Sequence, residues 1–179
     1  MVKLDLVANS GNDEFYTPKY AITPILEFLK PNSTIWCPFD KGESLFVKIL
    51  RKEGHKVIYS HIETGDDFFK FKEGFKCDYI ISNPPYSLKT EVLKKLFEIG
   101  KPFAMLLGVV GIFESQKRFE MFRDNEFEIL YFNRRIDYFK SYDEIKPSKN
   151  PPFSSVYITS KVLPKQIVFR EIDKKDTFI

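Results

Sequence analysis

The chain has 179 residues, of which 43% are hydrophobic and 16% aromatic, and its formal net charge at neutral pH is +3. This length and apolar content suit one compact domain with a substantial core and leave little room for a second domain. The mildly basic charge permits a nucleic-acid partner, but it excludes the strongly basic composition of a dedicated phosphate binder.

Short apolar runs alternate with helical patterns through the first two-thirds of the chain. Thr17-Pro18 and Thr23-Pro24 each have the form of a helix N-cap followed by proline at the first helical position. Asp40 and Glu43 have capping-box spacing and predict the start of another helix. The further elements expected in this part are strands at 34–39, 56–62, 77–82 and 103–109 and helices at 88–99 and 114–123.

Three more strand patterns follow with little helix between them, at 127–133, 155–162 and 166–172. Strands that alternate with helices predict an α/β fold, with a mainly parallel sheet and helices on both of its faces. The consecutive strands at the end of the chain predict an antiparallel C-terminal edge strand. The polar segment 142–152 is the one long loop, and long loops in compact domains are often functional.

The two cysteines, Cys37 and Cys77, lie inside apolar runs, which indicates buried free thiols in a reducing compartment. The only histidines are His55 and His61, no Cys/His cluster has metal-ligand spacing, and we expect no bound metal. The first ten residues lack the apolar core of a signal peptide, and no segment is long enough to span a bilayer. We therefore expect a soluble cytoplasmic protein without a membrane partner.

Asn-Pro-Pro followed by an aromatic residue occurs twice, as ISNPPYS at 81–87 and as KNPPFSS at 149–155. Asn83 directly follows a predicted strand, whereas Asn150 ends a polar loop and precedes one. Because ligands of an open parallel sheet bind outside the carboxyl ends of its strands, the position of Asn83 indicates that the first copy carries the chemistry.

The first copy suits methyl transfer to the exocyclic amino group of adenine or cytosine, which is a poor nucleophile because its lone pair is delocalised into the ring. The side-chain oxygen of Asn83 and the backbone carbonyl of Pro84 are acceptors for the two N–H bonds. Pro85 restricts Pro84 to an extended conformation, and Tyr86 offers a ring on which the base can stack. A rigid Pro-Pro turn is the structural alternative, but the order strand, motif, helix favours the chemistry.

With this motif in this position, the chain resembles the amino-methyltransferases of nucleic acid that use S-adenosylmethionine. It is most similar to the adenine-N6 DNA methyltransferases whose motifs run in the same order. The resemblance implies a three-layer Rossmann-like class I methyltransferase fold. It also implies a single methyltransferase domain over residues 1–179 without a separate target-recognition domain.

Two further segments match cofactor motifs of that family. The stretch Phe15-Tyr16-Thr17-Pro18 resembles its N-terminal motif, in which Tyr16, Thr17 and Pro18 would hold the methionine end of the cofactor. The free backbone N–H groups at a helix start suit such a carboxylate, although an ordinary capped helix has the same pattern. Asp67 and Phe68 match the pair that holds the cofactor adenine, with a turn and a core phenylalanine as the alternative.

The end of the second strand and the loop after the first depart from the family pattern. His61 stands where the family has an acid that binds the cofactor ribose, and Glu63 is the nearest acid, so both remain candidates. In the first loop Pro38, Phe39 and Asp40 occupy cofactor-binding positions, but the usual glycines are displaced. A group of small phage-encoded methyltransferases is similar in this loop, and that resemblance extends through residues 163–167.

The resemblance implies methyl transfer to adenine in DNA by a phage or prophage enzyme, with the target base flipped out of the duplex. Tyr86 and Phe153 are the candidates for the rings on the two faces of that base. Lys89, Arg134 and Arg135 are candidate DNA contacts, and Lys117 and Arg118 lie in similar segments, although a plain surface charge is the favoured interpretation of each.

Four alternatives stay open at the level of sequence. They are methylation of the cytosine amino group, of RNA, or of a protein glutamine, and a non-catalytic cofactor- or DNA-binding decoy. The sequence leaves the target site, the oligomeric state and the biological role undetermined.

Overall fold

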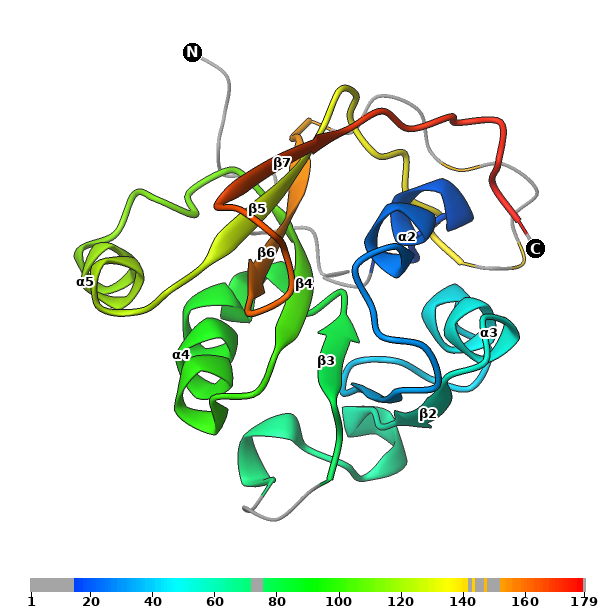
Figure 1. Cartoon of the computed structure of the whole chain (residues 1–179), viewed down its shortest axis with the longest axis horizontal. Helices are drawn as coiled ribbons and strands as arrows, with labels where there is room; N and C mark the ends of the chain where they lie inside the picture. Colours follow the sequence, from blue (N-terminus) through cyan, green and yellow to red (C-terminus); the bar gives the residue numbers. More distant parts are fainter. Residues whose placement is uncertain (1–14, 72–75, 142, 144–146, 148–151, 179) are drawn as a thin grey trace.

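The computed structural model describes residues 15–71, 76–141, 143, 147 and 152–178. Within these residues seven strands form one sheet, in the order β2-β1-β3-β4-β6-β5-β7. Helices α2 and α3 lie on one side of the sheet and α4 and α5 on the other (Figure 1). This three-layer arrangement confirms the predicted α/β fold class.

The elements agree with the expected ones, with bounds that differ by a few residues at their ends. The strands are β1 (Thr34–Cys37), β2 (Lys56–Tyr59), β3 (Tyr79–Ser82), β4 (Phe103–Gly108), β5 (Glu128–Phe132), β6 (Ser155–Ser160) and β7 (Ile167–Arg170). The helices are α2 (Lys19–Leu26), α3 (Leu45–Lys52), α4 (Lys89–Ile99) and α5 (Gln116–Asp124). Short 3₁₀ turns are η1 (Ile62–Thr64), η2 (Phe68–Lys70) and η3 (Tyr86–Leu88).

The antiparallel strand lies inside the sheet and not at its edge. β6 runs antiparallel to β4 on one side and to β5 on the other, while the C-terminal edge strand β7 is parallel to β5. The sequence predicted an antiparallel strand at the C-terminal edge of the sheet, and the structure has that strand between β4 and β5 instead. Every residue of β6 is buried, which a strand with neighbours on both sides and covered faces requires.

Two expected helix starts are also corrected. Pro24 lies inside α2, so the chain forms one helix there and not two, with Pro18 as its N-cap. Helix α3 is capped by Ser44, whose side chain accepts a hydrogen bond from the Phe46 backbone N–H, and Asp40 is not its cap. The hydroxyl of Ser44 satisfies one of the unpaired N–H groups at the helix start.

The core follows from the buried strands at the centre of the sheet. All residues of β3, β4 and β6 are buried. Cys37 and Cys77 are free and buried, as predicted, and burial raises the pKa of both thiols, that of Cys77 to about 11. The described part of the chain contains no helix that is long and apolar enough to cross a membrane.

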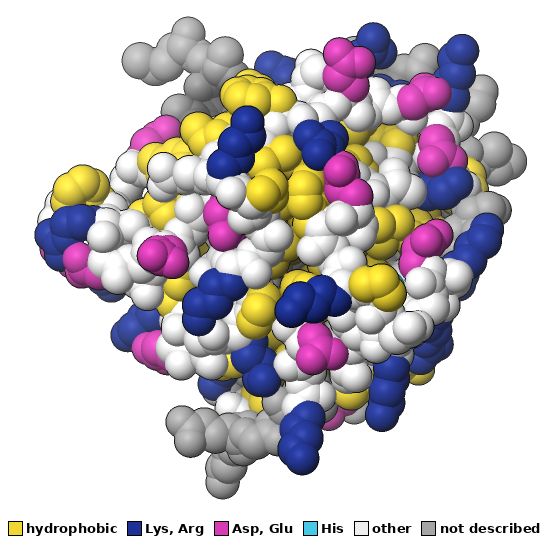
Figure 2. Space-filling view, viewed as in Figure 1, with side chains coloured by type: hydrophobic (Ala, Val, Ile, Leu, Met, Phe, Trp, Pro, Cys, Tyr) yellow, Lys and Arg dark blue, Asp and Glu magenta, His cyan; other side chains and the backbone are white. Residues whose placement is uncertain are grey.

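Basic and acidic side chains are interspersed on the face of the molecule that Figure 2 shows, with hydrophobic side chains between them. This mixture agrees with the small net charge of the sequence. Association with a polyanion would therefore depend on local contacts more than on a large uniform field over this face.

Candidate functional site

A cavity of about 270 Å³ opens at the carboxyl ends of β1, β2 and β3. The parallel register places the ends of these neighbouring strands at one edge of the sheet, where the chain leaves into loops. Nine of the predicted cofactor-binding residues line this cavity: Tyr16, Thr17, Pro38, Phe39, Asp40, His61, Asp67, Phe68 and Asn83. The structure thus brings together segments that are separated by as many as 67 positions, from Tyr16 to Asn83.

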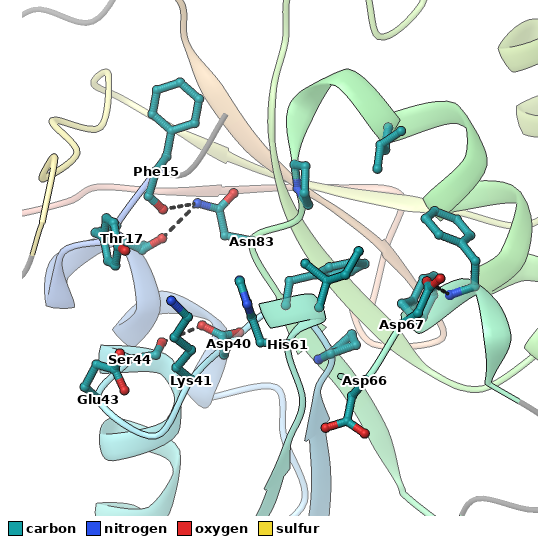
Figure 3. Close-up of a pocket in the computed structure, with 18 residues that line it drawn as sticks. Phe15, Thr17, Asp40, Lys41, Glu43, Ser44, His61, Asp66, Asp67 and Asn83 are labelled. Atoms are coloured by element: carbon teal, nitrogen blue, oxygen red, sulfur yellow. Dashed lines mark hydrogen bonds between the residues drawn. The ribbon is translucent and has the colours of Figure 1, made fainter. Parts of the chain in front are cut away.

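Asn83 is held with its amide in one orientation. Its Nδ2 donates to the Phe15 carbonyl at 2.8 Å and to Thr17 Oγ1 at 3.1 Å (Figure 3). Its Oδ1 is buried, and the structure shows no hydrogen-bond partner for that atom among the residues it describes. Because a buried acceptor without a partner carries a desolvation penalty, this oxygen marks a place where a donor from a ligand would be stabilised.

Asp40 joins the loop after β1 to the strand that ends at Asn83. Its carboxylate accepts hydrogen bonds from Ser44 Oγ at 2.5 Å and from the hydroxyl of Ser82, the last residue of β3. Its backbone N–H donates to the Ser60 carbonyl, just after β2. Burial raises the pKa of Asp40 to about 6, against the opposing effect of the two hydroxyl donors. Asp40 therefore connects the ends of three strands beneath the cavity, through its carboxylate to the end of β3 and through its backbone N–H to the residue after β2.

The two candidates for the ribose contact occupy different environments. His61 lines the cavity, and its Nδ1 accepts a hydrogen bond from the Glu63 backbone N–H at 3.2 Å. In the neutral ring this acceptor role places the proton on Nε2, so His61 is a hydrogen-bond donor there. Glu63 lies outside the cavity lining, is mostly exposed, and forms an ion pair with Lys41. The geometry therefore favours His61 over Glu63 as the residue that contacts the ribose of a ligand. Of the other predicted cofactor-binding residues, Pro18 also lies outside the cavity lining.

Asp67 lies at the end of the cavity opposite Asn83 and Thr17 (Figure 3), and the next residue, Phe68, also lines the cavity. Asp67 caps η2 by accepting from the Phe69 backbone N–H at 2.9 Å. Phe68 is buried and packs against Phe39, with ring centroids 4.9 Å apart. The alternative prediction, a turn and a core phenylalanine, is therefore correct for this pair. The same two residues also line the cavity.

The proposed base-binding residues form an aromatic cluster behind the cavity. Tyr86 and Phe153 are both buried, with ring centroids 5.5 Å apart and an interplanar angle of 77°. The Tyr86 hydroxyl donates to the Tyr138 hydroxyl at 2.8 Å, which donates in turn to Ser155 Oγ at 2.8 Å. The two rings meet edge to face, so their closure on one base from two sides stays a prediction. Pro84 is buried beside them and Pro85 lines the cavity.

The second Asn-Pro-Pro copy lies partly outside the described residues. Asn150 and Pro151 lie outside the described residues. Pro152 is exposed and Phe153 is 4% exposed. Phe153 therefore belongs to the core around Tyr86, in agreement with a scaffold role and compatible with a base contact.

The predicted DNA contacts divide into two kinds. Lys89 donates to the Val110 carbonyl at 2.7 Å, and Arg118 donates to the carbonyls of Ile112 and Gly111, so both hold the loop after β4. Arg134 and Arg135 are exposed after β5. The structural role of Lys89 was not foreseen, because it depends on a loop that is distant in sequence.

The sequence prediction assigned no cofactor role to several residues that shape the cavity. Phe15, Lys41 and Ser44 line it, and Ser82 binds Asp40 below it. The signals were present but weak: Ser44 stands four positions after Asp40, and Ser82 immediately precedes Asn83. Among the described residues no group of three or more His, Cys, Asp or Glu side chains is placed to hold a metal ion.

The fold is similar to that of a solved restriction-modification methyltransferase subunit. The solved type I restriction-modification system methyltransferase subunit from Streptococcus thermophilus superposes with a TM-score of 0.53 and 14% sequence identity, over 92% of this chain and 53% of that one. A protein described as a type I restriction-enzyme modification subunit from Vibrio vulnificus YJ016 gives a TM-score of 0.49 and 10% identity, over 85% and 45%. The chain thus spans about half the length of these proteins. No family model matches the chain, and no curated protein matches it.

Proposed function

We propose that this chain is an S-adenosylmethionine-dependent methyltransferase that methylates the exocyclic amino group of adenine in DNA, encoded by a phage or prophage. The observation that carries the proposal is the buried Oδ1 of Asn83, an acceptor without a partner among the described residues, beside a cavity at the carboxyl ends of the strands. The solved relative from Streptococcus thermophilus supports the fold on which the proposal rests.

The orientation of the Asn83 amide is what the chemistry requires. Because Phe15 and Thr17 take its two N–H bonds, its oxygen is left to accept an N–H from the substrate amino group. That acceptor stabilises positive charge as it develops on the attacking nitrogen, and it is already oriented before the substrate binds. The Pro84 carbonyl is the second proposed acceptor, and Tyr86 the ring beside the base.

The cavity residues fit S-adenosylmethionine, which supplies a methyl group on a positively charged sulfur. Tyr16 and Thr17 line one end of the cavity, and the Asp67 end offers a carboxylate next to Phe68. His61 is the proposed ribose contact, and the buried Asp40 carboxylate adds negative charge beside the place of the cation. In the loop after β1, a Cβ on Gly42 would meet the Tyr59 ring at 3.3 Å.

The proposed catalysis consists mainly of positioning. Asn83 and Pro84 hold the amino group so that its lone pair points into the cavity, at a near-attack distance of roughly 3–3.5 Å from the methyl carbon. No residue has to remove a proton before attack, because the methylated amine is acidic and releases its proton to water afterwards. The adenine must leave the duplex to reach this depth.

The test is transfer of a labelled methyl group from S-adenosylmethionine to DNA, RNA and protein in parallel, followed by nucleoside analysis. We expect N6-methyladenine in DNA. The variant Asn83→Ala should lower turnover by roughly 10²–10³-fold while cofactor affinity, measured by calorimetry, changes by less than about threefold. Asn125→Ala is the matched control, because that amide binds the Met121 carbonyl on α5 and has no part in the cavity.

Each other product would identify one of the alternatives. N4-methylcytosine, labelled RNA or labelled glutamine would replace the adenine assignment. Absence of S-adenosylmethionine binding by the wild-type chain would favour the decoy. Near-native turnover of Asn83→Ala would refute the role of Asn83.

A further inference from the structure

The face of Tyr86 on which a base would stack is covered by the protein itself. The ring of Phe15 lies against Tyr86 with centroids 4.9 Å apart and an interplanar angle of 24°. Phe15 also meets the edge of Phe153 at 5.5 Å, with an angle of 82°. An offset, nearly parallel pair at this distance has the geometry in which one aromatic ring stacks on another.

The cavity ends at this ring. Phe15 and Asn83 belong to its lining, but Tyr86 and Phe153 do not, and these two residues are 5% and 4% exposed. The site in which a flat base would meet Tyr86 is therefore filled in this structure. A base that enters through the cavity meets Phe15 first.

Tyr86 is not free to retreat. The Cβ of an alanine at Gly108 would lie 3.2 Å from both Tyr86 Cε2 and Phe153 Cδ2, so the two rings already pack directly on the backbone of β4. The hydroxyl of Tyr86 is tied to Tyr138, which is tied to Ser155 on β6. Space for a base must therefore come from the side on which Phe15 lies.

Phe15 can supply that space while its backbone stays in place. Its carbonyl accepts from Asn83, and the next residue, Tyr16, pairs with Phe139 through backbone hydrogen bonds of 2.9 and 3.2 Å. The side chain itself is only partly buried. Rotation about χ1 would move the ring and keep the contact that orients the Asn83 amide.

We propose that Phe15 closes the base site of the free protein by stacking on Tyr86, and that the target base binds by replacing this ring. The proposal rests on the proposed function, because it takes the base site to be the one beside Asn83. The apparent affinity for any base then equals its affinity for the open site multiplied by the fraction of molecules in which the site is open. This reduction is the same for every base, so Phe15 lowers affinity without changing the preference among bases.

The proposal is tested by the affinity of Phe15→Ala and wild type for short single-stranded DNA with one 2-aminopurine, whose fluorescence is quenched by stacking. Matched oligonucleotides with adenine, cytosine or an abasic site at that position serve as competitors. The variant should bind the three base-containing oligonucleotides roughly three- to tenfold more tightly, the range of one aromatic pair. Affinity for the abasic oligonucleotide should stay the same.

Two further variants control for folding and for a general effect of losing a phenylalanine. Phe15→Leu keeps apolar volume but cannot stack, and it should change affinity in the same direction. Phe169→Ala removes a ring that is 65% exposed on β7 and should change nothing. Thermal melts establish that each variant is folded.

Several results would overturn the proposal. Weaker or unchanged binding of the base-containing oligonucleotides by folded Phe15→Ala and Phe15→Leu would overturn the proposal, and weaker binding would make Phe15 a wall of the site. A changed adenine-to-cytosine ratio would also overturn it. If neither protein distinguishes a base from an abasic site, the proposal fails, and methyl transfer by the wild type decides separately whether the proposed function fails too.

Discussion

The buried carboxylate of Asp40 makes a measurable prediction about stability. Burial raises its pKa from 3.8 to about 6, so the folded chain binds this proton more tightly than the unfolded chain does. The stability that Asp40 contributes is therefore fully present below about pH 4 and is lost as the pH rises through about 6. A difference of one in pKa corresponds to about 1.4 kcal/mol, so the ionised carboxylate costs at most about 3 kcal/mol above that range.

The perturbation is Asp40→Asn. An asparagine keeps one acceptor for the hydroxyls of Ser44 and Ser82, which can rotate to accept from its amide, and it carries no charge to desolvate. At about pH 8 the variant should exceed the wild type in free energy of unfolding by roughly 1–3 kcal/mol, and at about pH 4 the two should agree.

The assay is urea unfolding of both proteins at several pH values between about 4 and 8. Other groups titrate in this range, but they cancel in the difference between the two proteins. Asp143→Asn is the control, because it makes the same replacement at an exposed position. A variant that is less stable than the wild type at pH 8, or a difference that does not vary with pH, would refute the reasoning.

Three further outcomes follow from contacts at the site. Thr17→Val removes one of the two acceptors that orient Asn83, so single-turnover methyl transfer at saturating cofactor should fall roughly three- to tenfold, and an unchanged rate would contradict this. Tyr86→Phe keeps the ring but loses the bond to Tyr138, so chemical denaturation should show a loss of about 1 kcal/mol, while turnover changes by less than about threefold. Gly108→Ala presses a methyl group against Tyr86 and should lower stability by about 1–3 kcal/mol, whereas a neutral effect would mean that the rings can yield.

The sequence predicted the fold class because strand and helix patterns are local. The apolar run that becomes β4 and the helical pattern that becomes α4 can each be recognised without knowing their neighbours. The predictions for Pro24 and Asp40 were wrong because the roles of these residues depend on tertiary contacts and not on local pattern. Pro24 lies inside a helix whose other contacts outweigh one lost hydrogen bond. Asp40 accepts from the hydroxyl of Ser44, which is the actual cap of α3, and from that of Ser82, 42 positions away.

The candidate site was predicted from motif chemistry, and the structure brings nine of its predicted cofactor residues to one cavity. The choice between His61 and Glu63 was open in the sequence, since both follow the same strand. It depends on which side chain faces the cavity and which turns outward to Lys41. The direction in which each side chain points is set by the 3₁₀ turn η1, and this turn is too short to have a periodic sequence pattern.

The sequence by itself determined the succession of strands and helices and the place of Asn-Pro-Pro-Tyr at the end of a buried strand, because both depend on neighbouring residues along the chain. Only the tertiary structure decided that β6 enters between β4 and β5, that Asn83 keeps its oxygen for a ligand, and that Phe15 covers Tyr86. These features join segments as many as 71 positions apart. Their contacts exist only when the chain is packed, and no local pattern encodes which side chains will meet.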